Sequence, residues 1–271
     1  MNIQHYEAFT TALVQTLERD PRVLGLMAMG SMARQSHQPD EWSDHDFWVV
    51  VQPGAVAWFR TRRDWLPNDD RIVLHFIDTQ HDGITAIYGS GHFVEFAVSD
   101  RGGLQHIKVN DYRLLIDRVG LAEDVAQLQH ATSAEMDLLG QNEVCLVGRF
   151  LTALLIGIGR YRRGELLSAR QLITVTAPQA LLRLIARFLP PEQPAPLDNI
   201  DPLRRFEQAY PEIGGTINAL LRLELDQAAV DLLDLGERLL RDRVPWYPVE
   251  AAAAVRRRLC AVSATPESYS R

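Results

Sequence analysis

Residues 22–51 read RVLGLMAMGSMARQSHQPDEWSDHDFWVVV, and this stretch decides the fold. Its opening, residues 22–29, is an apolar run typical of a buried strand, and the Gly-Ser pair at 30–31 breaks that run into a turn. A gap of twelve residues follows, and Asp-His-Asp at 44–46 then leads into the apolar run at 47–51. The pattern predicts two buried strands, the first ending in a glycine turn and the second beginning with a pair of acids.

The acid pair at the head of the second strand points to a metal site. Side chains at positions i and i+2 of a strand share one face, so Asp44 and Asp46 project together. Two adjacent carboxylates repel each other, and a divalent cation between them relieves that repulsion. Hard oxygen ligands suit Mg²⁺, which commonly takes one or two carboxylates together with substrate phosphates. The alternative is that Asp44 belongs to a turn and that Asp46 is a charge that protects an edge strand from aggregation.

The glycine turn has the composition of a phosphate-binding loop. Gly30 lacks a Cβ and lets a phosphate approach the backbone closely, and Ser31 offers a hydroxyl and an amide N–H. The segment 32–35 can begin a short helix whose free N–H groups favour an anion, and Arg34 adds a positive charge. A phosphate-binding turn that faces two carboxylates is suited to a metal-bound nucleoside triphosphate such as ATP.

The Gly-Ser pair at 30–31 followed by Asp44-x-Asp46 resembles the nucleotidyltransferase superfamily typified by DNA polymerase β. Smaller bacterial members include the aminoglycoside and lincosamide nucleotidyltransferases. The resemblance, which covers residues 22–100, implies that the turn holds the triphosphate, that both Asp bind metal ions, and that a third carboxylate stands on a neighbouring strand. It also implies in-line attack of a hydroxyl on the α-phosphate, with pyrophosphate leaving and two metal ions about 4 Å apart.

Glu95 is the first choice for the third carboxylate. It is a lone charge within the apolar run at 93–98, and antibiotic-modifying members of the family often carry an acid at a comparable place. The resemblance implies that Glu95 is a metal ligand, the catalytic base, or both. Asp78, which follows the apolar run at 72–77, is the alternative, and Glu95 would then be a solvent-facing charge on an edge strand.

Near residue 120 the strand-like apolar runs give way to apolar residues at helical spacing, and this change predicts an α+β fold in two domains. Domain 1–120 is expected to be a nucleotidyltransferase domain, a mixed sheet flanked by helices, and domain 121–271 to be entirely helical. Apolar residues in three- and four-residue steps predict one long helix over 133–163. Helices are further expected at 3–18, 55–65, 165–175, 178–189, 201–209, 213–223, 225–242 and 248–262, and strands at 22–29, 46–52, 72–77, 84–88, 93–98 and 112–116.

Three histidines in the first domain are expected to be structural. His45 alternates away from the acid pair, so we expect it to pack or to form hydrogen bonds behind the site. His75 and His92 lie within or beside predicted strands, where a buried, hydrogen-bonded histidine is the expected state.

Composition narrows the class of partner. The net charge of −7 argues against a nucleic-acid partner, because proteins that bind nucleic acids usually carry a basic surface. Cys145 and Cys260 lack metal-ligand spacing and suggest a reducing cytosol. No signal peptide is evident, and the longest strongly apolar stretch, Leu151–Ile158, is too short to span a bilayer. A cytoplasmic protein without a membrane partner is expected.

The expected activity is a Mg²⁺-dependent transfer of a nucleoside monophosphate, AMP from ATP, to a hydroxyl of a small molecule. The resemblance suggests an aminoglycoside or lincosamide antibiotic as the acceptor, and hence a role in antibiotic resistance. Two alternatives stay open, namely an antitoxin-like enzyme that modifies a partner protein, and a nucleotide-binding module without catalysis. The base preference, the acceptor and a homodimeric state also stay open.

Overall fold

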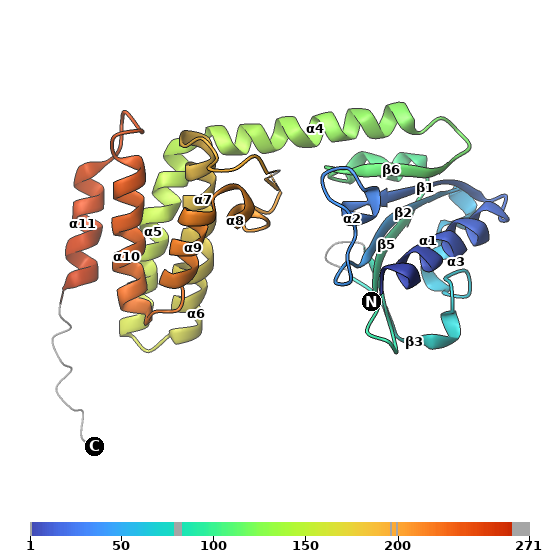
Figure 1. Ribbon diagram of the computed structural model, residues 1–271, viewed down its shortest axis with the longest axis horizontal. Helices are drawn as coiled ribbons and strands as arrows, with labels where there is room; N and C mark the ends of the chain where they lie inside the picture. Colours follow the sequence, from blue (N-terminus) through green and yellow to red (C-terminus); the bar gives the residue numbers. More distant parts are fainter. Residues whose placement is uncertain (1, 79–82, 196, 199, 262–271) are drawn as a thin grey trace, which may run out of the picture. The chain divides into compact units, whose positions relative to one another are not determined.

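The computed structural model describes residues 2–78, 83–195, 197–198 and 200–261 (Figure 1). The chain forms two compact units, Met1–Glu135 and Met136–Arg271. The boundary falls inside helix α4 (Ala122–Gln141). Unit 1 holds every described strand and unit 2 is helical in its described part, so the predicted α+β class is confirmed.

Unit 1 is built on one six-stranded sheet with the order β3-β4-β5-β2-β1-β6. Strands β2 and β5 are parallel and every other pair is antiparallel, so the sheet is mixed, as predicted. Two neighbouring parallel strands need a long connection, and here β3 and β4 form it. The strands are β1 (Val23–Met29), β2 (His45–Val51), β3 (Ile72–Ile77), β4 (Ile84–Tyr88), β5 (Phe93–Ser99) and β6 (Tyr112–Asp117).

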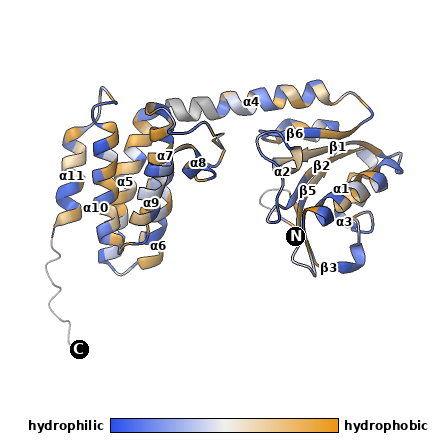
Figure 2. Ribbon diagram, viewed as in Figure 1, coloured by the Kyte–Doolittle hydropathy of each residue, from blue (hydrophilic) through white to orange (hydrophobic). Residues whose placement is uncertain are grey.

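One face of the sheet is closed by α1 (Ile3–Glu18) and α3 (Val56–Thr61), together with the short helix η1 (Pro53–Ala55), and the short helix η2 (Asp69–Arg71) leads into β3. Helix α1 turns an apolar stripe toward the sheet, where it meets alternate residues of β2. The strands of the sheet are drawn largely as hydrophobic ribbon in Figure 2. The buried residues of this contact include Phe9, Leu13, Leu17, Phe47, Val49 and Val51.

The opposite face of the sheet is covered only in part. A smaller apolar cluster joins Met27 and Val50 of the sheet to Leu104 of η3 (Arg101–His106) and to Val125 of α4. The ion pair between Lys108 and Glu135, 2.8 Å from Nζ to Oε1, ties the segment after η3 to α4. Because β2 alternates, Asp46 belongs to this second face, beyond the apolar cluster.

Unit 2 packs its helices around α5 (Glu143–Arg162). The other elements are α6 (Leu166–Arg170), the π-helix η4 (Gln171–Thr176), α7 (Ala177–Phe188), α8 (Phe206–Ala209), α9 (Pro211–Leu220), α10 (Leu225–Leu240) and α11 (Val249–Cys260). Gly157 allows the close approach of η4, because a Cβ there would lie 2.6 Å from Ile173.

Three predicted helices differ from the structure, and one of them, the helix expected over 201–209, begins only at Phe206. The single helix expected over 133–163 is wrong, because the chain breaks at Asn142, whose side chain accepts a hydrogen bond from the Cys145 amide and caps α5. The helix expected over 55–65 ends at Thr61, and the Trp65 indole then donates to the carbonyl of Arg62, which stabilises the turn.

By length and composition, α5 is the one described helix that could cross a membrane, which an inspection confined to Leu151–Ile158 misses. A helix in the core of a domain meets the same criterion. In this chain Leu146, Phe150 and Leu154 of α5 are buried in the core of unit 2.

Candidate active site

Gly30 brings the backbone close to the acid pair. It follows β1 directly and opens the short helix α2 (Gly30–Ala33) with a φ of +51°, a conformation that favours glycine. A Cβ at this position would lie 3.7 Å from Oδ2 of Asp46. The open backbone of the glycine turn therefore faces a carboxylate on the neighbouring strand.

Glu95 is the direct neighbour of Asp46 in the sheet. The two residues are partners in the parallel register between β2 and β5, so their side chains leave the same face. Glu95 is exposed and Asp46 is half-buried. Gly83 borders the same place, because a Cβ there would lie 3.5 Å from Glu95 Oε1. The structure thus brings together Gly30, Asp46 and Glu95.

Asp78 lies elsewhere in the sheet. It follows the edge strand β3, and β4 and β5 stand between that strand and β2. Its backbone N–H donates to the carbonyl of Gly83, 2.8 Å away, at the end of the β3–β4 pair. Of the two candidates for the third carboxylate, Glu95 is the one placed beside Asp46.

Asp44 and Ser31 both influence the ionisation of the Tyr6 phenol. Asp44 lies half-buried immediately before β2, and Ser31 is buried in α2. Burial raises the pKa of Tyr6 to about 12, while the Ser31 hydroxyl lowers it and the Asp44 carboxylate raises it. The Tyr6 hydroxyl oxygen is buried and has no hydrogen bond of good geometry among the described residues. Tyr6, which resembles an ordinary core position of α1 in the sequence, therefore belongs to the site.

Arg34 ends α2 in the left-handed conformation and forms an ion pair with Glu7 of α1. Both side chains are partly exposed. A phosphate at this position would compete with the Glu7 carboxylate for the guanidinium, so the predicted phosphate contact of Arg34 requires that pair to rearrange.

The donor set suits magnesium only in part. Within the residues that the structure describes, no three His, Cys, Asp or Glu side chains are close enough together to hold a metal ion. The register pair of Asp46 and Glu95 nevertheless places two hard oxygen donors side by side on an open face. Mg²⁺ commonly uses one or two carboxylates and takes its remaining ligands from phosphates and water. The carboxylates here fit that pattern and do not form a complete protein cage.

A buried chain of hydrogen bonds lies behind the acid pair. His45 Nε2 is 2.9 Å from Thr10 Oγ1, and His45 Nδ1 is 2.8 Å from His92 Nε2. Both histidines are buried, so the buried, hydrogen-bonded state expected for them is confirmed. The prediction for His75 is wrong, because its Nε2 is buried without a hydrogen-bond partner among the described residues. The part played by Thr10 is not apparent from the sequence, where it is one polar position in an amphipathic helix.

The histidine pair makes stability depend on pH. Burial lowers the pKa of His45 to about 3 and that of His92 to about 4, from 6.5 for the unfolded group. As the pH falls below 6.5, the unfolded chain takes up protons that the folded chain refuses, so the free energy of unfolding decreases. We expect the thermal midpoint of the wild type to fall between pH 7 and pH 5, and that of H92Q to fall less.

The matched control for this pH series is H130Q, at an exposed position of α4. Carboxylate protonation affects every variant, so the difference between the H92Q and H130Q profiles isolates the buried pair. Parallel profiles for the two variants would contradict the expectation.

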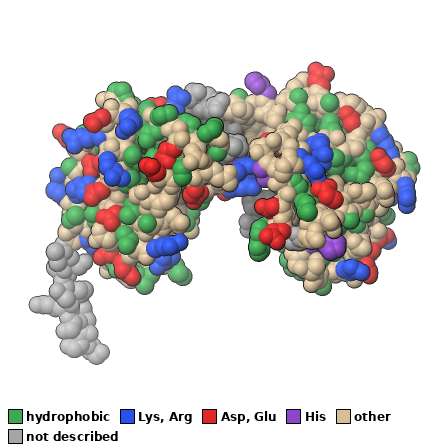
Figure 3. Space-filling model, in the orientation of Figure 1, with side chains coloured by type: hydrophobic (Ala, Val, Ile, Leu, Met, Phe, Trp, Pro, Cys, Tyr) green, Lys and Arg blue, Asp and Glu red, His purple; other side chains and the backbone are tan. Residues whose placement is uncertain are grey.

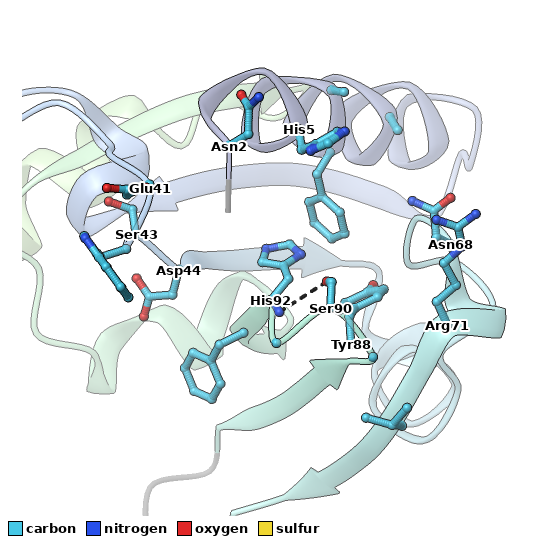
Figure 4. A pocket seen from close by; sticks show the side chains of 18 of the residues that line it. Asn2, His5, Glu41, Ser43, Asp44, Asn68, Arg71, Tyr88, Ser90 and His92 are labelled. Carbon is cyan, nitrogen blue, oxygen red and sulfur yellow. Dashed lines mark hydrogen bonds between the residues drawn. The ribbon is translucent and has the colours of Figure 1, made fainter.

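A cavity of about 1090 Å³ adjoins the site in unit 1 (Figure 4). Asp44 lies on its wall, so the cavity reaches one of the predicted metal ligands. It extends between α1 and the turn that joins β4 to β5. Its aromatic lining consists of His5, Phe9, Trp42, Tyr88, His92 and Phe93.

Comparisons with known proteins leave the family undetermined. No protein-family model matches the chain, and no curated protein matches it. Among solved structures, it is similar to a protein described as an aminoglycoside 6-adenyltransferase from Bacillus subtilis, with 11% identity and a TM-score of 0.32. That alignment covers 93% of this chain and 98% of the other. A likeness this weak carries no functional argument, so the function has to be inferred from the site.

Proposed function

We propose that this chain is a metal-dependent nucleotidyltransferase that moves AMP from ATP to a hydroxyl of a small molecule and releases pyrophosphate. The observation that carries the proposal is the register pair of Asp46 and Glu95, with the backbone of Gly30 facing Asp46. Carboxylates beside an open glycine backbone form a site for a metal-bound triphosphate. The motif of a Gly-Ser turn followed by Asp44-x-Asp46 supports the same class of reaction.

Each residue of the site has a role in the proposed reaction. Asp46 and Glu95 are the proposed metal ligands in the geometry described, and Asp44 is proposed as a third that would have to move closer to join them. Bound Mg²⁺ would supply charge neutralisation and Lewis-acid activation. Gly30 leaves room for the phosphates and the Ser31 hydroxyl donates a hydrogen bond to them. Glu95 accepts the proton of the attacking hydroxyl.

The bonds in the proposed step balance. The acceptor oxygen forms a bond to the α-phosphorus as its proton passes to the Glu95 carboxylate. The bond from the α-phosphorus to the bridging oxygen breaks, and that oxygen leaves with its electron pair as part of pyrophosphate. The products are the AMP ester of the acceptor and pyrophosphate.

Charge favours a small acceptor over a nucleic acid. The net charge is −7, and on the face drawn in Figure 3 the Lys and Arg side chains of each unit are intermixed with Asp and Glu. The resemblance of the motif to antibiotic nucleotidyltransferases makes aminoglycosides and lincosamides the first acceptors to test.

The test incubates the full chain with ATP, Mg²⁺ and a panel of hydroxyl-bearing small molecules that includes both antibiotic classes. We expect pyrophosphate release that depends on one acceptor, a product heavier by one AMP unit, and loss of both signals on addition of EDTA. Radiolabel from α-labelled ATP on a protein would instead indicate the protein-modifying alternative. Binding of ATP with no pyrophosphate release across the panel would indicate a module without catalysis.

A further inference from the structure

The cavity beside Asp44 has walls suited to a flat, uncharged ring. Phe9, Tyr88 and Phe93 contribute aromatic faces and edges from α1, β4 and β5. Three carboxylates, those of Glu41, Asp44 and Asp70, line it against the one guanidinium of Arg71, and this balance of charge disfavours a phosphate group inside. Because Asp44 belongs both to the cavity wall and to the proposed metal site, a nucleotide with its phosphates at the acids can place its base here.

Neighbouring rings fix the orientation of His92, which lies at the centre of this cavity. The Tyr88 ring stacks on it with a centroid distance of 5.2 Å, and the Phe9 ring meets it edge-on at 4.7 Å. Figure 4 shows the imidazole pointing into the cavity from the start of β5. Because aromatic neighbours pack on two sides of the imidazole, the directions of its two nitrogens are fixed.

The buried hydrogen-bond chain also sets the polarity of His92. The Thr10 hydroxyl donates its one proton to the Tyr6 carbonyl, 3.1 Å away, so its oxygen accepts from His45 Nε2, 2.9 Å away. The proton of neutral His45 is therefore on Nε2. His45 Nδ1 is then an acceptor, and its partner at 2.8 Å, His92 Nε2, must donate to it.

It follows that Nδ1 of neutral His92 carries a lone pair and no proton. Among the described residues, His92 Nδ1 has no hydrogen-bond partner, and burial keeps the ring neutral by lowering its pKa to about 4. The cavity therefore offers a ligand one fixed hydrogen-bond acceptor, His92 Nδ1. A ligand whose carbonyl oxygen faced this nitrogen would place two acceptors against each other, and no hydrogen bond could form.

We propose that this cavity receives the base of the nucleotide and that His92 Nδ1 accepts a hydrogen bond from an exocyclic amino group, so that His92 selects adenine over a base with a carbonyl at that position. The proposal rests on the proposed function for the place of the phosphates. Recognition of the base is a property of the cavity alone and can be measured without metal, acceptor or turnover.

The experiment measures binding of adenosine and inosine to the wild-type protein by equilibrium dialysis without Mg²⁺. The two nucleosides differ at C6, which carries an amino group in adenosine and a carbonyl in inosine, and at N1, which carries a proton only in inosine. We expect adenosine to bind at least about tenfold more tightly, because inosine leaves the buried acceptor unpaired. Purine riboside, which has neither group, is expected to bind with intermediate affinity.

The variant H92Q tests the assignment to His92. Its amide can rotate to donate or accept, so it is expected to bind adenosine and inosine within about twofold of each other. The control H130Q, at an exposed position of α4 outside the cavity lining, is expected to keep the wild-type ratio. Circular dichroism and the thermal midpoint establish that both variants fold.

The outcomes separate this proposal from the proposed function. Equal affinity of the wild type for adenosine and inosine, or no binding of either, would overturn it, as would a folded H92Q with an unchanged ratio. Selective binding of adenosine without any pyrophosphate release would support the base cavity and count against the transfer reaction alone.

Discussion

The variant D46N is expected to lose more than a hundredfold in the rate of pyrophosphate release while keeping its fold. Loss of a residue that only supports a metal ligand typically costs about 10- to 100-fold in affinity or activity, so loss of a ligand costs more. Asp46 faces Gly30 on one side and Glu95 on the other, and asparagine there retains the size of the side chain but not its charge. Steady-state release of pyrophosphate from ATP and the best acceptor measures the effect.

Stability provides the second readout for D46N. The substitution removes one of two neighbouring carboxylates, so we expect the free energy of unfolding in EDTA to stay within about 1 kcal/mol of the wild-type value. Added Mg²⁺ and ATP should raise the thermal midpoint of the wild type and not that of D46N, because only the wild type binds the ion tightly. D242N, at an exposed turn after α10, is the matched control. Wild-type turnover by D46N would rule out the proposed metal site.

The variant E95Q is expected to lower the maximal rate by about a hundredfold or more, the usual contribution of a general base. The acidic limb of the pH–rate profile should also flatten, because the group that must be deprotonated is gone. Glu95 is exposed, so its replacement should leave the thermal midpoint unchanged. The rate and the pH profile together distinguish a base from a residue that only shapes the surface.

D78N is the partner experiment for E95Q, since Asp78 was the other candidate from the sequence. It follows the edge strand β3, away from β2 in the sheet order, so D78N is expected to keep close to wild-type activity. The opposite result, with D78N inactive and E95Q active, would move the third carboxylate to Asp78 and remove the role assigned to Glu95.

The six strands were predictable because each is a short apolar run bounded by turn residues. Such runs define β2 and β5 individually, and a charge such as Glu95 stands out in one of them. Their pairing was not predictable from the residues themselves. Strand β5 lies between β4 and β2 and runs parallel to β2. This long-range pairing is what brings Glu95 to Asp46.

The features that were not predicted depend on partners distant in sequence or on a single polar residue. Tyr6 and Thr10 occupy the apolar side of α1 and are indistinguishable there from core residues, until His45 lies against both. The helical spacing of apolar residues continues without a shift across the break at Asn142. The cap becomes evident only in the structure, where the Asn142 side chain accepts a hydrogen bond from the Cys145 amide. Periodicity reports the buried face of a helix and gives no information about its hydrogen-bonded interruptions.

The ion pair between Lys108 and Glu135 has a consequence for labelling chemistry. Lys108 is the sole lysine of the 271-residue chain, where arginine supplies all the other strong bases. Amine-reactive dyes and crosslinkers therefore have one side-chain target, which is half-exposed beside α4. A fluorophore attached there would report on that helix without engineered cysteines, and high ionic strength would make the amine more accessible to the reagent by weakening its attraction to Glu135.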